Sequence, residues 1–185
     1  MTDKEEIIRH TRNWVNRVVV GLNFCPFAAK EVRRGSIHYD TIETDDTEKS
    51  LELVAQAFLQ LDQNEQIETT LLIFPESLQD FNDYLHFVEL TESLLEEMNY
   101  EGVYQVASFH PNYLFQGSGE DDPANYTNRS PYPMLHLLRE ASLSAAIDSF
   151  PDVDGIPERN IELARKKGLA QMKALWAACF SNTKD

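Results

Sequence analysis

Cysteine and long apolar runs are scarce in this chain, and each shortage excludes a class of protein. Only Cys25 and Cys179 occur among 185 residues, in dissimilar settings. We therefore expect no disulfide framework and a location in the reducing cytoplasm. The opening Met1-Thr-Asp-Lys-Glu-Glu is charged and lacks a small-residue cleavage site, which argues against a secretory signal. No apolar run approaches the roughly 20 residues that span a bilayer, so we expect no membrane partner.

Basic side chains are also few. Lys and Arg total 16 against 31 Asp and Glu, a formal net charge of −15. Because nucleic acids and anionic membranes attract basic surfaces, this charge disfavours both as partners. Between Asp40 and Glu101 the only Lys or Arg is Lys49. Such acidity is typical of solvated helix faces, and the alternative is an acidic surface that docks a basic partner.

Motifs with a fixed spacing are missing as well. The chain has no P-loop, no Gly-x-Gly-x-x-Gly, no His-Glu-x-x-His and no Cys-x-x-Cys. Nucleotide binding and standard zinc motifs therefore have no support. Function has to be sought in individual side chains and in the places that the fold gives them.

The hydrophobic pattern predicts a single globular domain over residues 1–185, with hydrophobic residues at 42%. β-rich segments predict strands at 37–42, 69–74 and 103–109. Residues 134–139 could form a fourth strand or a short helix opened by Pro133, and we favour the strand because Glu140 and Ser142 then start a new helix. Apolar spacing predicts helices at 7–22, at 51–61, from a Ser77 cap to before Gly102, from Glu140 through Phe150, and over 157–180 with a break at Gly168. This alternation predicts an α/β (or α+β) fold with a mixed sheet of about four strands and roughly five to six helices packed on it.

A candidate site follows the third predicted strand. Apolar residues at both parities of 103–109 suggest burial on both faces and hence a central strand. Ligands of open α/β sheets bind beyond the carboxyl ends of strands, so His110 is a candidate general base or metal ligand. The alternative is a hydrogen-bonded structural histidine. His136, on the segment after the long loop, is a second candidate imidazole.

Cys25 is a candidate nucleophile or metal ligand. Pro26 is a favoured first helical residue, which would make Cys25 the N-cap of a new helix. Exposed amide groups and the helix dipole stabilise a thiolate at such a position. The alternative is a small hydrophobe wedged between Phe24 and Phe27.

The connection over residues 110–133 is longer than a compact domain normally tolerates without a function. Asp122 and the nearby Asn125, Asn128 and Arg129 permit two interpretations. Carboxylate and amide groups could bind a divalent cation or act as acid and base, with Arg129 holding an anion. Alternatively, these side chains satisfy the backbone of the loop itself, with Arg129 as a local clamp.

Four segments together resemble the bacterial domain-of-unknown-function 1415 family: Asn16 to Phe27, Ala107 to Pro111, Asn125 to Glu140, and Glu158-Arg-Asn160. The resemblance spans nearly the whole chain and implies a soluble, single-domain bacterial protein. It supplies no reaction. It does imply importance for polar residues in or just beside the signature segments, which are Cys25, His110, Asp122, Asn125, Asn128, Arg129, His136, Arg139 and Glu140.

Three hypotheses follow from these residues. The first is a small cytoplasmic enzyme, a hydrolase or group transferase acting on a small anionic molecule. Cys25, His110 and Asp122 would be its catalytic residues, and Asn125, Asn128, Arg129 and Arg139 would bind the substrate. The second is a metal site, for zinc or another divalent metal, with Cys25, His110 and His136 as ligands. The third is a non-catalytic protein-interaction module, and the oligomeric state stays open.

Overall fold

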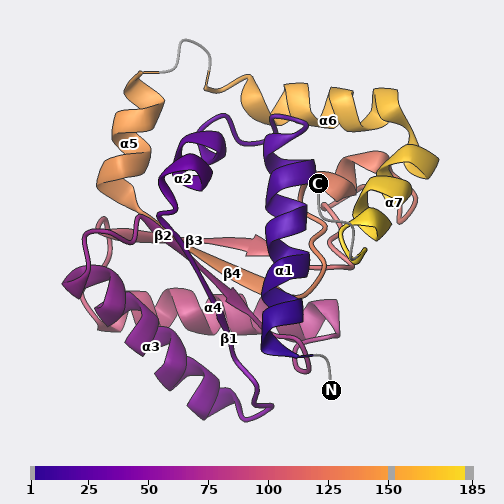
Figure 1. The fold of residues 1–185 in the computed structure, drawn as a ribbon. Helices are drawn as coiled ribbons and strands as arrows, with labels where there is room; N and C mark the ends of the chain where they lie inside the picture. The colour runs from indigo at the N-terminus through magenta and orange to yellow at the C-terminus, as the bar shows by residue number, and fades with distance from the viewer. Residues whose placement is uncertain (1–2, 150–152, 182–185) are drawn as a thin grey trace.

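A mixed four-stranded sheet organises the computed structural model, which describes residues 3–149 and 153–181. Its strands are β1 (Ile37–Thr41), β2 (Thr69–Ile73), β3 (Tyr104–Phe109) and β4 (Met134–Arg139). The order across the sheet is β1-β2-β4-β3. β1 and β2 are parallel, whereas β4 is antiparallel to both of its neighbours. Together with helices on both faces, this confirms the predicted α/β fold with a mixed sheet (Figure 1).

One prediction about the sheet was wrong. β3 lies at an edge, and β4 takes the central place beside β2. The apolar residues of β3 occur at both parities because helices cover both faces even at this edge. Tyr104 and Val106 pack into the core cluster on one face, and Phe109 packs into the cluster on the other.

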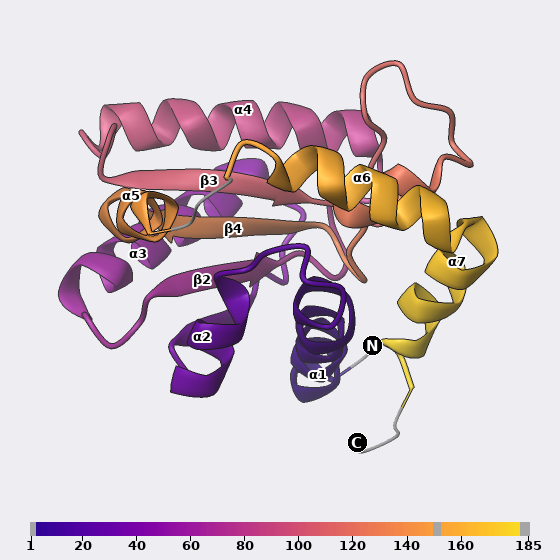
Figure 2. The ribbon, with the colours of Figure 1, turned by 90° about the horizontal axis from the view of Figure 1, so that it is seen from above.

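Helices α3 (Thr47–Gln63) and α4 (Phe81–Glu97) cover one face, on the opposite side of the sheet from α1 and α2 (Figure 2). Asp46 caps α3 by accepting from the Lys49 amide at 2.8 Å. Asp80, and not the predicted Ser77, caps α4 by accepting from two backbone amides at 2.8 and 3.1 Å. The helix starts later because Leu78 adopts a left-handed conformation with φ +58°, which turns the chain before α4.

The other face carries the remaining helices. They are α1 (Lys4–Trp14) with the π-helix η1 (Val15–Val20), α2 (Ala28–Arg34), α5 (Glu140–Asp148), α6 (Ile156–Lys167) and α7 (Leu169–Ala178). Gly168 separates α6 from α7 as predicted, at φ +82°. The predicted end of α5 at Phe150 lies outside the described residues. The described part of the chain thus has seven α-helices, one more than the upper end of the predicted range.

The long connection from β3 to β4 contains only a short 3-10 helix, η2 (Pro123–Thr127). It packs against α6 and α7 at the end of the sheet where β3 finishes and β4 begins. Across residues 3–149 and 153–181, no helix combines the length and the apolar character needed to cross a bilayer.

Candidate functional site

A pocket of about 640 Å³ opens between the sheet and helices α2 and α5. Figures 1 and 2 show these two helices at the end of the sheet away from α7. Strand residues of all four strands line it, including Ile37, Leu71, Ala107 and Leu138. Its walls come from α1, η1, the turn before α2, and α5. The volume and the mainly apolar lining are those of a small-molecule site.

Cys25 reaches this pocket through an irregular turn. The π-helix η1 leads into Gly21, whose amide donates to the carbonyl of Asn16, five residues back, at 2.9 Å. A Cβ on Gly21 would lie 2.3 Å from the carbonyl oxygen of Arg17, so only glycine fits there. Asn23 then takes a left-handed conformation with φ +54°. π-type helical turns are frequent at functional sites.

A distant helix holds the same turn in place. Nδ2 of Asn160 donates to the carbonyl of Phe24 at 2.7 Å, and Arg159 donates to the carbonyl of Asn23. The side chain of Asn160 is only 9% exposed, so its bond is shielded from water. Two of the segments that resembled the family therefore meet here and fix the position of Cys25.

Cys25 is not a helix N-cap, contrary to the prediction. α2 begins at Ala28 with Phe27 in the cap position, and Pro26 lies in the preceding turn. Pro26 is not the first residue of the helix, because the chain leaves η1 through Asn23, in a left-handed conformation, and makes a further turn before α2 begins at Ala28. Cys25 is a free, half-buried thiol that lines the pocket. Cys179 is fully buried, and burial raises its pKa to about 11.

His136 lies on the pocket floor in β4, and its proton has a defined position. Oγ1 of Thr69 lies 2.6 Å from Nε2 of His136 and 2.6 Å from the carbonyl oxygen of Leu137. A carbonyl only accepts, so the hydroxyl proton goes to Leu137, and Nε2 must donate to Thr69. Nδ1 is then the unprotonated nitrogen, and no described residue hydrogen-bonds to it.

Burial favours the neutral form of the His136 ring. His136 is half-buried on the floor of the pocket, with the sheet and its helices packed around it. This burial lowers the pKa of His136 to about 4. A neutral imidazole with a free Nδ1 accepts a hydrogen bond from a group inside the pocket, and a ring with so low a pKa holds a transferred proton only during a reaction step.

Charged residues gather where α2 and the start of β2 border the pocket. Lys30 and Arg34 have side chains that are 67% and 56% exposed, and each lies 3.5 Å from the carboxylate of Glu31. Glu31 also accepts from the hydroxyl of Ser36 at 2.6 Å. Glu68 lines the same region. The two cations thus extend from the apolar pocket toward solvent.

His110 lies elsewhere, at the carboxyl end of β3. The amide of Asn112 donates to its Nδ1 at 3.0 Å, so Nε2 carries the proton and donates to the carbonyl of Leu78 at 3.0 Å. The side chain is 0% exposed, and burial lowers its pKa. Both ring nitrogens are occupied, which is the arrangement of the structural alternative.

The polar residues of the long loop hold the loop itself together. Asn125 is 0% exposed, accepts from the Phe115 amide and the Ser118 hydroxyl, and donates to the carbonyl of Gly119. Asp122 caps η2 and binds Arg165 at 2.7 Å, and this hydrogen bond lowers the pKa of the Asp122 carboxyl.

Three further predicted residues also bind backbone groups. Asn128 donates to the carbonyl of Ser108 at 3.4 Å. The guanidinium of Arg129 donates to the carbonyls of Tyr113 and Glu120 and lies over the Tyr126 ring. Arg139 lines the pocket, but its guanidinium donates to carbonyls at the end of α3 and beyond it, those of Leu61, Asn64 and Ile67.

The pocket therefore brings together Cys25, His136 and Arg139, and not His110 or the four loop residues. Among the described residues, no group of three or more His, Cys, Asp or Glu side chains could hold a metal ion. Cys25, His110 and His136 do not form a three-ligand site.

Several pocket residues were missed from the sequence. Thr69 and the α2 cations Lys30 and Arg34 were not singled out, nor were the α5 residues Ser142 and Leu143. No local pattern marks Thr69, which lies between the polar residues Glu68 and Thr70 at the start of its strand segment.

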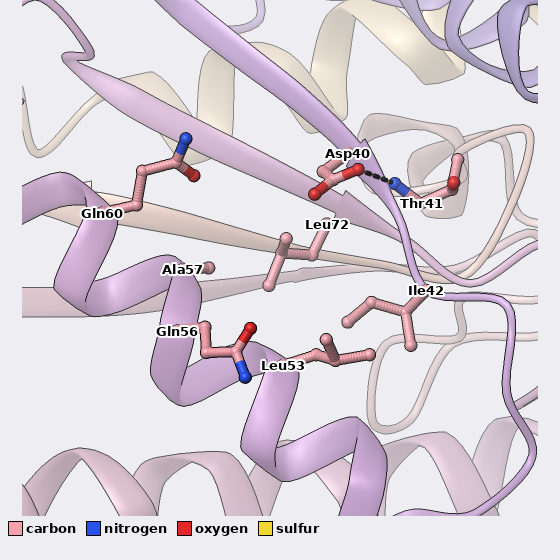
Figure 3. Close-up of a pocket in the computed structure, with 8 residues that line it drawn as sticks. All are labelled: Asp40, Thr41, Ile42, Leu53, Gln56, Ala57, Gln60 and Leu72. Carbon is pink, nitrogen blue, oxygen red and sulfur yellow. Dashed lines mark hydrogen bonds between the residues drawn. The ribbon is translucent and has the colours of Figure 1, made fainter.

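A second pocket, of about 270 Å³, lies between β1 and α3 (Figure 3). Asp40, Gln56 and Gln60 surround it above an apolar floor that includes Leu72. The carboxylate of Asp40 already accepts from Lys4 at 2.7 Å and from a backbone amide at 2.9 Å. None of the predicted site residues lines it.

The fold and the larger pocket define a small α/β domain with a mainly apolar cavity that contains a thiol and a neutral imidazole. The family model described as "Protein of unknown function (DUF1415)" matches residues 6–174, and the chain belongs to this family. This confirms the resemblance seen in the sequence. Searches of curated proteins and of solved structures each found no significant match.

Proposed function

We propose that this protein is an enzyme that catalyses hydrolysis or group transfer on a small molecule bearing an anionic group. Cys25 is its nucleophile and His136 its proton acceptor. One observation carries the proposal: two distant segments deliver a free thiol and a neutral imidazole to the same pocket of about 640 Å³. A nucleophilic thiol with a nearby base is a recurring catalytic arrangement.

The pocket chemistry supports a substrate with an apolar body and an anionic end. The mainly apolar interior favours burial of hydrocarbon. A buried charge without a partner is costly, so the anionic group would stay at the border beside Lys30 and Arg34. These side chains retain about half or more of their exposure and both are paired with Glu31 at 3.5 Å, so an anionic group of a ligand would compete with that carboxylate for them.

Cytoplasmic location belongs to the same proposal. Both cysteines are free thiols, and a nucleophilic Cys25 needs a reducing compartment to stay reduced. The net charge of −15 supports a small-molecule substrate over nucleic acid.

Alkylation of the full-length protein by iodoacetamide and iodoacetate tests the roles of the two residues. We expect Cys25 to react well before the buried Cys179, and His136→Gln to slow the reaction with no large change in melting temperature. Lys30 and Arg34 should attract the negatively charged reagent. The ratio of the iodoacetate rate to the iodoacetamide rate should therefore be higher for Cys25 than for free cysteine. An unchanged Cys25 rate in His136→Gln contradicts the proposed pair.

Turnover provides the second measurement. A panel of carboxylate-bearing esters, amides and thioesters should include substrates that the wild type converts and that Cys25→Ala does not. If the wild type converts none of the panel, or if Cys25→Ala converts them equally well, the enzyme proposal fails.

A further inference from the structure

We infer that the substrate is an acyl thioester with an apolar acyl chain, and that Cys25 is acylated during the reaction. The inference rests on the proposed function, because it uses Cys25 as nucleophile and His136 as proton acceptor. It adds the class of substrate, the bond that breaks, and the part of the pocket that holds each end of the substrate.

The interior of the pocket requires an uncharged reacting group. The polar side chains on its sheet floor are the neutral His136 and the hydroxyl of Thr69, which already bind each other. Arg139, a cation of β4 that lines the pocket, is occupied by carbonyls at the end of α3 and beyond it. A phosphoryl or carboxylate group there would be buried without a counter-charge, at high cost. The carbonyl of an acyl group is neutral and meets this condition.

The walls are suited to a hydrocarbon chain. η1 contributes Val15 and Val19, and α5 contributes Leu143, Ala145 and Ala146. Ser142 and Ser149 line the same side, but most of the exposed lining is apolar, and burying the methylenes of a chain against it is favourable. An acyl chain of several carbons therefore gains more from this pocket than an acetyl group does.

The border of the pocket suits an anionic carrier. Lys30 and Arg34 lie on α2, close in sequence to Cys25, and both line the pocket with exposed side chains. A carrier thiol with phosphate groups, such as coenzyme A, would leave its phosphates in solvent near these cations. The scissile carbonyl would then lie inside, between Cys25 and His136.

The chemical step balances without an oxidant or a metal. Cys25 and His136 line the same pocket without a direct hydrogen bond between them in the described structure, so the proton of the Cys25 thiol passes to Nδ1 of His136 through a pocket water as Sγ attacks the thioester carbonyl. The carbon–sulfur bond to the carrier then breaks, and the same proton passes to the departing sulfur. The products are S-acyl Cys25 and the free carrier thiol. Attack by water, or by a second acceptor, releases the acyl group and restores the thiol.

Intact-mass measurement with octanoyl-coenzyme A as the probe tests this inference. We expect one octanoyl group on Cys25, none on Cys25→Ala, and an undiminished adduct on Cys179→Ala. His136→Gln should slow acylation by about 100-fold, the scale of general-base catalysis. Acetyl-coenzyme A should acylate Cys25 more slowly than the octanoyl compound.

A double variant and a matched single variant test the border of the pocket. The double variant Lys30→Gln/Arg34→Gln should slow acylation by octanoyl-coenzyme A. It should not change the rate with octanoyl-N-acetylcysteamine, which has no phosphate. Arg33→Gln removes an exposed cation of the same helix that does not line the pocket, and should change neither rate.

The outcomes separate this inference from the proposed function. If octanoyl thioesters leave Cys25 unmodified, or if acetyl and octanoyl groups transfer equally fast, the inferred substrate class is wrong. Should alkylation of Cys25 still depend on His136 in that case, the proposed catalytic pair stands. If His136→Gln changes neither the alkylation rate nor the acylation rate of Cys25, both the inferred substrate class and the proposed catalytic pair are wrong.

Discussion

The hydroxyl of Thr69 lies 2.6 Å from Nε2 of His136, on the neighbouring strand, and determines which nitrogen of that ring carries the proton. Thr69 lies in β2 and His136 in β4, so the pairing of two strands far apart in sequence creates the free Nδ1. An ordinary sheet contact thereby prepares a side chain for proton transfer.

Thr69→Val tests this contact. The change leaves the buried Nε2–H without an acceptor, at a cost of about 1–3 kcal/mol, and frees the ring to rotate. We expect slower alkylation of Cys25 together with reduced stability in urea. Thr70→Val is the matched control, because Oγ1 of Thr70 is buried without a hydrogen-bond partner among the described residues. Thr70→Val should be neutral or stabilising and leave the Cys25 rate unchanged; the opposite ranking would contradict the assignment.

Gly21→Ala should damage the turn that carries Cys25. Its Cβ would meet the carbonyl oxygen of Arg17 at 2.3 Å, so the end of η1 has to shift. Backbone shifts of this kind typically cost about 1–3 kcal/mol, and the reactivity of Cys25 should change with them. Gly119→Ala is the control, since a Cβ there meets nothing within 4 Å. Urea unfolding and alkylation rates measure both effects, and equal behaviour of the two variants would refute the role given to Gly21.

Asn160→Ala should loosen the same turn from outside. The lost bond to the Phe24 carbonyl is buried, and an unpaired buried carbonyl costs about 1–3 kcal/mol. Because α1 and its core remain intact, we expect a moderate loss of stability with a larger relative change in Cys25 alkylation. Glu162→Ala, an exposed position of the same helix, serves as the control. A wild-type alkylation rate in Asn160→Ala would show that Cys25 is positioned without this helix.

The fold was readable from sequence where local patterns decide it. The four strands were located to within a residue at each end. Apolar and β-branched runs mark the first three directly, whereas 134–139 has no β-branched residue, and the preference for a strand over a short helix there rests on the new helix that begins at Glu140. Strand order was not readable in the same way. A strand with apolar residues on both faces, such as β3, looks alike in sequence at an edge and in the centre of a sheet when helices cover both faces.

The candidate site was only partly readable for a related reason. Cys25 and His136 both stand out as residue types, but their shared pocket depends on β4 inserting beside β2 and on the turn after η1. No sequence pattern marks the hydrogen bond from the Gly21 amide to the carbonyl five residues back, which shapes this turn. For the long loop, the sequence left a ligand site and self-bonding open, and the contacts of Asn125 and Arg129 are those of the second alternative.

Stability should fall as the pH is lowered from 6.5 to 5. Burial lowers the pKa values of His110 and His136, the latter to about 4, so the unfolded chain binds protons at a higher pH than the folded one. The stabilisation is complete above the unfolded pKa of about 6.5 and is lost toward the folded pKa, by up to about 1.4 kcal/mol per pH unit for each histidine. Urea unfolding at pH 7.5 and 5 measures this loss. It should shrink in His136→Gln and persist in His86→Gln, whose parent side chain is 71% exposed.

Asn125→Ala tests whether the long loop contributes to stability alone or also to the reactivity of Cys25. The side chain is 0% exposed and makes three hydrogen bonds that hold residues 115–125 together. Removing it leaves buried polar groups unpaired, so we expect a loss of about 1–3 kcal/mol for each unsatisfied group. None of these contacts reaches the pocket, and the alkylation rate of Cys25 below the unfolding transition should therefore match the wild type. If Asn125→Ala keeps its stability but its Cys25 is alkylated more slowly, the loop contributes to the functional site. The site would then extend beyond the pocket next to α2 and α5.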